Sequence, residues 1–194
     1  MKKMYITRKE KIIFSIIDLI DEIGIKELSI KEIAKKENIT EAALYKHFES
    51  KEQMLIEVLD YYSRYDRNIN LTLANSSDTE KEKIRKYFKL YSEYYDSYPA
   101  VTAIIDCYNI LIHEKNIAPK IIEIYSNRKN FIEQLIKDGQ DKGNINNNIK
   151  SNNLTCILLG TFQRAIFSWR LNGFKFSLKE KTTELIDDIL KVYL

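Results

Sequence analysis

The chain has 194 residues, of which 44% are hydrophobic, enough to bury a core in one large domain or two smaller ones. Its formal net charge of +3 neither requires nor excludes a nucleic-acid partner, so local charge has to decide that question. With only 5 glycines and 2 prolines, the composition disfavours many strands and turns and predicts long helices with short connections.

The composition also limits the classes of function. No apolar run is long enough to span a bilayer, and the start of the chain lacks the apolar segment of a signal peptide, so we expect a cytoplasmic protein with no membrane partner. Cys107 and Cys156 lie in helical patterns without metal-ligand spacing, which predicts two reduced core residues. With two histidines and no phosphate loop or nucleophile elbow, we expect no catalytic site, no metal and no cofactor.

The first helix is predicted to begin after Thr7, because Thr7 and Glu10 have the spacing of a capping box. Isoleucines then recur at helical spacing up to Ile23, and Gly24 is placed to end the helix. The basic tail before Thr7 could contact DNA phosphate or remain solvated, and the same two alternatives hold for the basic residues of the first turn, Arg8, Lys9 and Lys11.

Residues 29–51 predict three closely spaced helix starts. Ser29 has the spacing of a capping box with Glu32, Thr40 can cap a short helix over residues 41–48, and Ser50 can cap the helix that follows. Between the first two helices, residues 37–39 form a turn in which Asn38 tolerates the left-handed conformation. Two helices joined by so tight a turn are typical of a helix-turn-helix, whose second helix enters the major groove of DNA.

The short helix over residues 41–48 has to bury Leu44 and Phe48, since it is too short to be stable alone. The remaining face carries small alanines that allow close approach to base edges, and polar or basic side chains suited to phosphate. The pattern at fixed spacing is Ser29, Glu32-Ile33-Ala34, Ile39-Thr40, Leu44-Tyr45, His47-Phe48, Ser50-Lys51-Glu52 and Leu55.

This pattern resembles the N-terminal domain of the TetR family of transcriptional repressors. The resemblance covers roughly the first quarter to third of the chain and implies DNA contacts from the following positions: Ser29, Lys31, Thr40, Glu41, Ala42, Ala43, Tyr45, Lys46, His47 and Lys51. Two positions depart from the family pattern. Asn38 stands where the family commonly has glycine, and Glu41 places a carboxylate that phosphate repels, unless it accepts a hydrogen bond from a cytosine amine.

A helix from Lys51 to about Ile69 follows, and the resemblance implies that it is the lever between the DNA-binding and C-terminal domains. Residues 68–77 are rich in Asn, Ser and Thr and predict a loop, after which Ser77 and Glu80 have the spacing of a capping box. Pro99 suits the first turn of the next helix, which is predicted to end at His113, and another helix is predicted from about Pro119 to the glycines at 139–143.

The middle helices carry many tyrosines at three- and four-residue steps, a pattern typical of core packing. So many hydroxyls could instead line a partly polar ligand cavity, and the resemblance implies an effector pocket here. The candidates are Tyr62, Tyr91, Tyr95, Tyr108, Phe131, Phe162 and Trp169, with Arg164 as a partner for an anion.

The last two helices are predicted over about 152–171 and from Ser177 to the end of the chain. The first is apolar on two faces, with Cys156, Leu159, Gly160 and Phe167 on the second, so both faces have to be covered. The resemblance implies a homodimer interface in which these helices form a four-helix bundle. The alternative is packing within one chain.

The sequence therefore predicts an all-α protein of about nine helices. Residues 1–50 are expected to form a three-helix DNA-binding domain, and residues 51–194 a helical domain for effector binding and dimerisation. The predicted function is a ligand-responsive repressor that binds a near-palindromic double-stranded operator as a dimer, with an unknown small-molecule effector. The alternative is a helical ligand-binding or partner-binding module whose helix-turn-helix no longer reads DNA.

Overall fold

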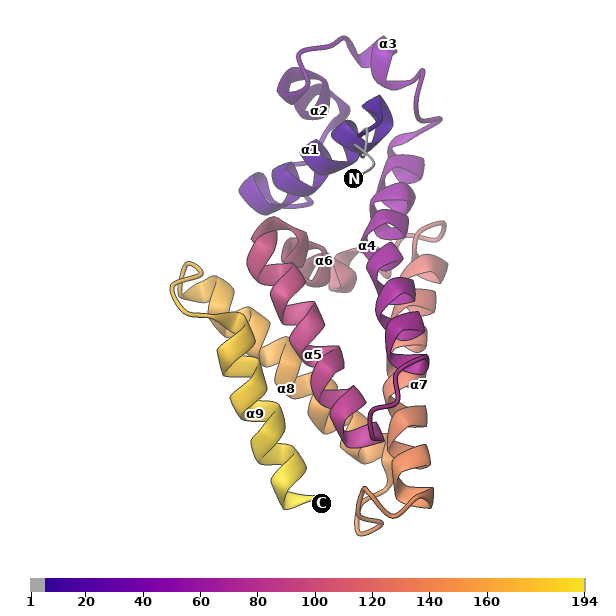
Figure 1. Ribbon diagram of the computed structural model, residues 1–194. Helices are drawn as coiled ribbons and strands as arrows, with labels where there is room; N and C mark the ends of the chain where they lie inside the picture. Colours follow the sequence, from indigo (N-terminus) through magenta and orange to yellow (C-terminus); the bar gives the residue numbers. More distant parts are fainter. Residues whose placement is uncertain (1–5, 194) are drawn as a thin grey trace. The chain divides into compact units, whose positions relative to one another are not determined.

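The computed structural model describes residues 6–193, and over this range the chain is all-α, as predicted (Figure 1). The predicted contact of the basic tail with DNA concerns residues that lie largely outside this range. The described elements are α1 (Arg8–Ile23), α2 (Ile30–Lys36), α3 (Glu41–Leu44), α4 (Lys51–Ala74), α5 (Glu80–Ser97), the 3-10 helix η1 (Pro99–Thr102), α6 (Ala103–Leu111), α7 (Ala118–Asp141), α8 (Ser151–Leu171) and α9 (Leu178–Val192).

The chain divides into two compact units. One comprises residues up to Arg64 together with Ala100–Glu123, and the other comprises Tyr65–Pro99 and Ile124–Leu194. Helices α4 and α7 each contribute residues to both units.

The first unit is held by the apolar face of α1, on which the isoleucines from Ile12 to Ile20 are buried. The predicted capping box of Thr7 and Glu10 is present, and Gly24 ends the helix with φ 79°, a conformation that favours glycine. Helices α2 and α6 both contact α1, and α3 contacts α2. The last turn of α1 differs from the prediction, because Ile23 is exposed at the end of the apolar stripe.

The second unit is held by α5, which packs along α9, while α9 also packs against α8 (Figure 1). The aromatic residues of α5 form its core: Tyr87, Phe88, Tyr91 and Tyr95 are all buried. At the start of α9, the backbone amides of Leu178 and Lys179 donate to the Asp96 carboxylate of α5 at 3.2 and 3.1 Å. A carboxylate at a helix N-terminus satisfies amides that have no partner within the helix and interacts favourably with the helix dipole.

Three predicted helix boundaries are wrong. Helix α3 ends at Leu44, and residues up to His47 continue as turns, although the Phe48 amide still donates to the Leu44 carbonyl. Helix α4 continues to Ala74 through most of the predicted loop, because Ile69 and Leu73 bury the same apolar face as Tyr62. Helix α6 ends at Leu111 and is preceded by a 3-10 turn at Pro99.

The predicted cap of α5 is also wrong. The N-cap is Thr79, which forms a complete capping box with Glu82. Ser77 was predicted to cap the helix with Glu80 as its capping-box partner, but Glu80 is buried, with 4% of its surface exposed. Its carboxylate accepts from Lys142 Nζ at 2.6 Å and from Asn144 Nδ2 at 2.8 Å. Several Ser and Thr residues in this segment can cap a helix about equally well. Thr79 is the cap in the structure, where Glu80 is paired with residues that follow α7.

Candidate functional site

The helix-turn-helix is built by its caps and its turn. The Ser29 hydroxyl accepts from the Glu32 amide at 3.2 Å and begins α2, and the Thr40 hydroxyl accepts from the Ala43 amide at 3.2 Å and begins α3. Between them Asn38 has φ 52°, the left-handed conformation predicted for it. Leu44 and Phe48 are buried, so the short α3 is anchored by its apolar residues and presents its other side to solvent.

Most of the predicted DNA contacts lie on this solvent side. Tyr45 is 50% exposed. Lys31, Thr40, Glu41, Ala42, Lys46 and His47 are also exposed, while Ser29, Ala43 and Lys51 are half-buried. The exposed set includes two lysines, the Tyr45 hydroxyl and the small side chain of Ala42, which are suited to phosphate and base edges.

Some basic groups of this unit, including the predicted contact Lys51, are engaged within the protein. Lys51 Nζ donates to the Leu28 carbonyl. Arg8 forms an ion pair with Glu37 at 3.0 Å, and Lys9 forms one with Glu57 at 2.6 Å. Such pairs lower the positive charge that these groups offer to phosphate, whereas Lys31 and Lys46 remain exposed on α2 and just after α3.

The effector candidates are shared between the two units. In the second unit Tyr91, Tyr95 and Phe162 pack on one another, and the rings of Tyr95 and Phe162 are stacked with centroids 6.0 Å apart. Phe131 stacks on Tyr87 at 5.7 Å. Tyr62 and Tyr108 belong to the other unit, where Tyr62 is fully buried and Tyr108 is half-buried.

The remaining two candidates lie on α8. Trp169 is buried, and its indole Nε1 donates to the Phe176 carbonyl at 2.8 Å, so this side chain joins α8 to the segment before α9. Arg164 is exposed, and its guanidinium lies over the Phe167 ring at 4.9 Å. Of the six candidates in the second unit, four belong to the aromatic cluster, Trp169 is buried against the segment before α9, and Arg164 is exposed on α8.

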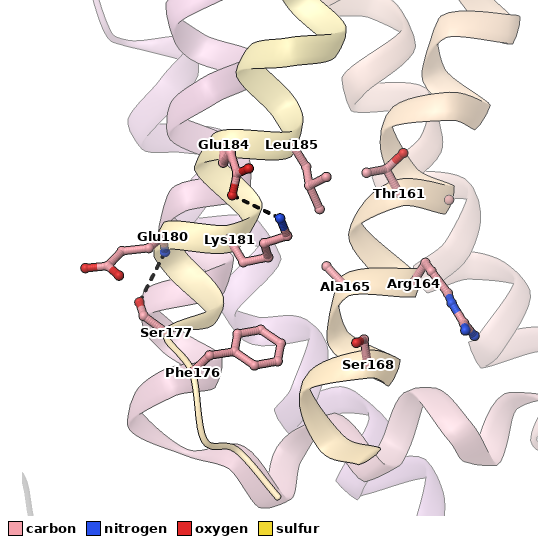
Figure 2. Close-up of a pocket in the computed structure, with 11 residues that line it drawn as sticks. Thr161, Arg164, Ala165, Ser168, Phe176, Ser177, Glu180, Lys181, Glu184 and Leu185 are labelled. Carbon is pink, nitrogen blue, oxygen red and sulfur yellow. Dashed lines mark hydrogen bonds and ion pairs between the residues drawn. The ribbon is translucent and has the colours of Figure 1, made fainter. Parts of the chain in front are cut away.

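A pocket of about 800 Å³ lies between α8 and α9 (Figure 2). It includes Arg164 but none of the other effector candidates. Its lining residues are Gly160, Thr161, Arg164, Ala165, Ser168, Phe176, Ser177, Glu180, Lys181, Glu184 and Leu185. A methyl group added at Gly160 would meet nothing within 4 Å, so this part of α8 faces open space.

The same side of α8 exposes several apolar residues. Phe167 is 41% exposed and Leu171 is 70% exposed, and Ile157 lies on the same stripe. Cys107 is buried as predicted, but Cys156 is exposed, so the prediction of two core cysteines is wrong for the second. The reason is that the described residues cover only one of the two apolar faces of α8.

Sequence reasoning missed a buried polar cluster in the second unit. Asp66 of α4 is 7% exposed and forms an ion pair with Arg128 of α7 at 2.7 Å, and the Tyr91 hydroxyl of α5 donates to the same carboxylate at 2.5 Å. Burial raises the pKa of Tyr91 well above its ordinary value, so the phenol stays protonated and acts as a donor. The signal in the sequence was a carboxylate at an apolar helical position, between Tyr62 and Ile69.

Among the described residues, no helix is long and apolar enough to cross a membrane, and no group of three His, Cys, Asp or Glu side chains is placed to hold a metal ion.

A capped helix-turn-helix with an exposed polar and basic face, attached to a larger all-α segment, defines a DNA-binding transcriptional regulator. Residues 12–58 match the family model described as "Bacterial regulatory proteins, tetR family", and residues 61–192 match that of the "YsiA-like protein, C-terminal region". The chain belongs to the TetR family, as the sequence pattern predicted.

The relatives of known name are distant in sequence but cover most of the chain. The "Fatty acid metabolism regulator protein" of Bacillus subtilis is 22% identical over 186 residues, covering 91% of each chain. The "Nucleoid occlusion factor SlmA" of Vibrio campbellii is 20% identical over 171 residues, covering 87% of each. A solved structure of Bacillus subtilis FadR in complex with stearoyl-CoA has a TM-score of 0.80 at 18% identity, covering 93% of this chain and 96% of that one.

Proposed function

We propose that this regulator is a repressor that binds a near-palindromic operator as a homodimer and is released from it by an acyl-CoA thioester. The observation that carries the DNA-reading part is the exposed face that α3 and the following turn present beside the capped start of α2. Capped helix starts direct backbone amides towards phosphate, and the small side chains allow close approach to bases.

The homodimer rests on the uncovered face of α8. Phe167 and Leu171 are exposed, Gly160 leaves open space, and the pocket of Figure 2 runs along the neighbouring α9. A second copy supplies the same surface by two-fold symmetry, so the apolar residues of both copies would be buried together. Two copies also provide two reading helices, which have to lie about 34 to 36 Å apart to enter successive major grooves.

The effector class rests on the relatives. One is named a fatty acid metabolism regulator, and the other was solved with stearoyl-CoA. In this chain, the aromatic core around Tyr91 and Phe162 offers apolar surface for an acyl chain once its rings rearrange. The domain division at residue 50 and the individual site residues remain predictions.

The test is a DNA-binding titration with the upstream region of the protein's own gene and a scrambled DNA of equal length. We expect specific binding that weakens steeply with salt, because each phosphate contact releases a counterion. Adding lauroyl-CoA should then lower operator affinity. Binding to the upstream region no stronger than to scrambled DNA would favour the alternative, a helical binding module whose helix-turn-helix does not read DNA. An affinity that lauroyl-CoA leaves unchanged would contradict the effector class alone.

A further inference from the structure

The cluster of Asp66, Tyr91 and Arg128 joins three helices of the second unit. Both carboxylate oxygens of Asp66 are used: Oδ1 accepts from Tyr91 Oη at 2.5 Å and from Arg128 Nη2 at 2.7 Å, and Oδ2 accepts from Arg128 Nε at 2.8 Å. The pairing is therefore bidentate, with the flat edge of the guanidinium against the carboxylate. This is the geometry in which arginine binds carboxylates and phosphates of any origin.

This ion pair carries a large desolvation cost. Removing two charges from water is expensive, and buried pairs are often no more stabilising than apolar side chains of similar volume. Around it the unit already packs by aromatic contacts, since the centroid of the Tyr91 ring lies 5.8 Å from that of Tyr65 and 4.8 Å from that of Tyr87. Stability alone therefore gives no reason for a charged pair at this position.

The surroundings of Arg128 suit a ligand that has an anionic group and an apolar body. The guanidinium carbon lies 5.0 Å from the centre of the Tyr91 ring, and that ring also contacts Tyr95 and Phe162. The one cation of this cluster, whose side chain is 16% exposed, thus lies at the edge of a continuous aromatic surface. An anion bound to the same guanidinium edge would place its apolar part against these rings.

We propose that Arg128 is the anion-binding residue of the effector site, and that Asp66 is an internal competitor which the anionic group of the effector replaces. This inference rests on the proposed function and specifies the effector chemistry: a carboxylate or phosphate attached to a long apolar chain. The guanidinium keeps a compensating charge throughout the exchange, so its own burial adds no further cost.

The exchange leaves Asp66 as the group without a cation. An unpaired carboxylate in an apolar interior is strongly disfavoured, so Asp66 has to move towards water. Asp66 belongs to α4, an uninterrupted helix from Lys51 to Ala74, and a helix transmits displacement along its axis. Effector binding is thereby coupled to the end of α4 that begins directly after the helix-turn-helix.

The test is calorimetric titration of the full-length protein without DNA, using lauroyl-CoA, laurate and uncharged dodecanol as probes. Asp66→Asn keeps an acceptor for Tyr91 but removes the competing charge, so we expect it to bind the anionic probe at least tenfold more tightly than the wild type. Arg128→Met should bind it at least tenfold more weakly. Lys137→Met is the control, because it removes an exposed cation from the same helix and should leave binding unchanged.

Arg128→Met leaves Asp66 unpaired and could fail to fold, so Asp66→Asn/Arg128→Met is measured as well, and we expect it to bind as weakly as a folded Arg128→Met would. If lauroyl-CoA binds and laurate does not, the anionic group that Arg128 binds is a coenzyme phosphate. If laurate binds, that group is a free carboxylate. Equal affinities across the variants, dodecanol binding as tightly as the anionic probes, or no binding even to Asp66→Asn would overturn the inference. The calorimetric titration contains no DNA, so its result does not depend on operator binding. A protein that fails to bind the operator would therefore contradict the proposed function but not this inference.

Discussion

At the scale of single residues, charge is placed where it has a defined partner. Glu80 shows this most clearly: hydrogen bonds from Lys142 and Asn144 lower the pKa of its carboxyl from the ordinary 4.5 to about 2. The folded protein therefore holds Glu80 ionised at pH values at which the unfolded chain would bind a proton. Such a group contributes stability above pH 4.5, and the contribution disappears as the pH falls through the range from 4.5 towards 2.

Glu80→Gln is therefore expected to lower the free energy of unfolding at pH 7 by about 1 kcal/mol, a modest value because the partner lysine is largely solvated. The difference from the wild type should shrink as the pH falls below 4.5 and vanish near pH 2. Urea denaturation at a series of pH values measures it, with exposed Glu27→Gln as the control. If the two proteins differed in free energy of unfolding by the same amount down to low pH, the stabilisation would not come from the ionised Glu80 carboxylate.

The exposed side chains after α3 should act on DNA without acting on the fold. Tyr45→Ala removes a half-exposed side chain, so the melting temperature should hardly change, while affinity for operator and scrambled DNA should fall by a similar factor of about ten. Lys46→Ala is expected to change the preference between the two DNAs instead. Lys89→Ala, an exposed lysine of α5, should alter neither. Fluorescence anisotropy with both DNAs distinguishes these outcomes.

At the scale of the element, the reading helix is maintained by its ends. Helix α3 has only 4 residues, too few to be stable alone. It is fixed by the Thr40 cap, by buried Leu44 and by Phe48 in the turn beyond it. The DNA-reading geometry therefore depends on one hydroxyl and two apolar contacts more than on the helix itself.

Thr40→Ala should destabilise the protein by about 1 kcal/mol, because the Ala43 amide loses the Thr40 hydroxyl and keeps only the Thr40 carbonyl as an acceptor. Hydrogen exchange at the Ala43 amide should become faster, and operator affinity should fall. Thr40→Ser retains the hydroxyl and serves as the matched control, with near wild-type exchange at Ala43. Equal exchange in the two variants would show that the cap does not hold α3.

At the scale of the whole molecule, the uncovered face of α8 is the feature that a single chain leaves unexplained. Its exposed residues follow a helical stripe, and α8 is apolar on both sides. A helix of this kind has to be covered on both faces, and residues 6–193 of one copy cover only one of them.

Phe167→Glu should therefore convert dimers to monomers and lower operator affinity by more than a hundredfold, since one half-site then binds alone. Sedimentation analysis measures the mass, and circular dichroism checks that the helices remain. Ile122→Glu is the control, because it adds the same charge at an apolar residue of α7 that is 54% exposed. A Phe167→Glu protein that remains dimeric would place the interface elsewhere.

The sequence by itself determined the parts of this protein that depend on short stretches of chain. The cap of α1, the left-handed Asn38, the caps of α2 and α3 and the exposed Tyr45 follow from residues at most four positions apart. Helical periodicity and capping act over one or two turns, so they can be predicted from neighbouring residues in the sequence.

Only the tertiary structure decided which polar groups are paired and where some helices end. Asp66 meets Arg128 across 62 positions, and Lys51 meets the Leu28 carbonyl across 23. Glu80 became a buried ion-pair partner because residues after α7 lie against it, which also left Thr79 to cap α5. Contacts between distant residues depend on how helices pack, and packing free energies outweigh the small differences between competing local caps and helix ends.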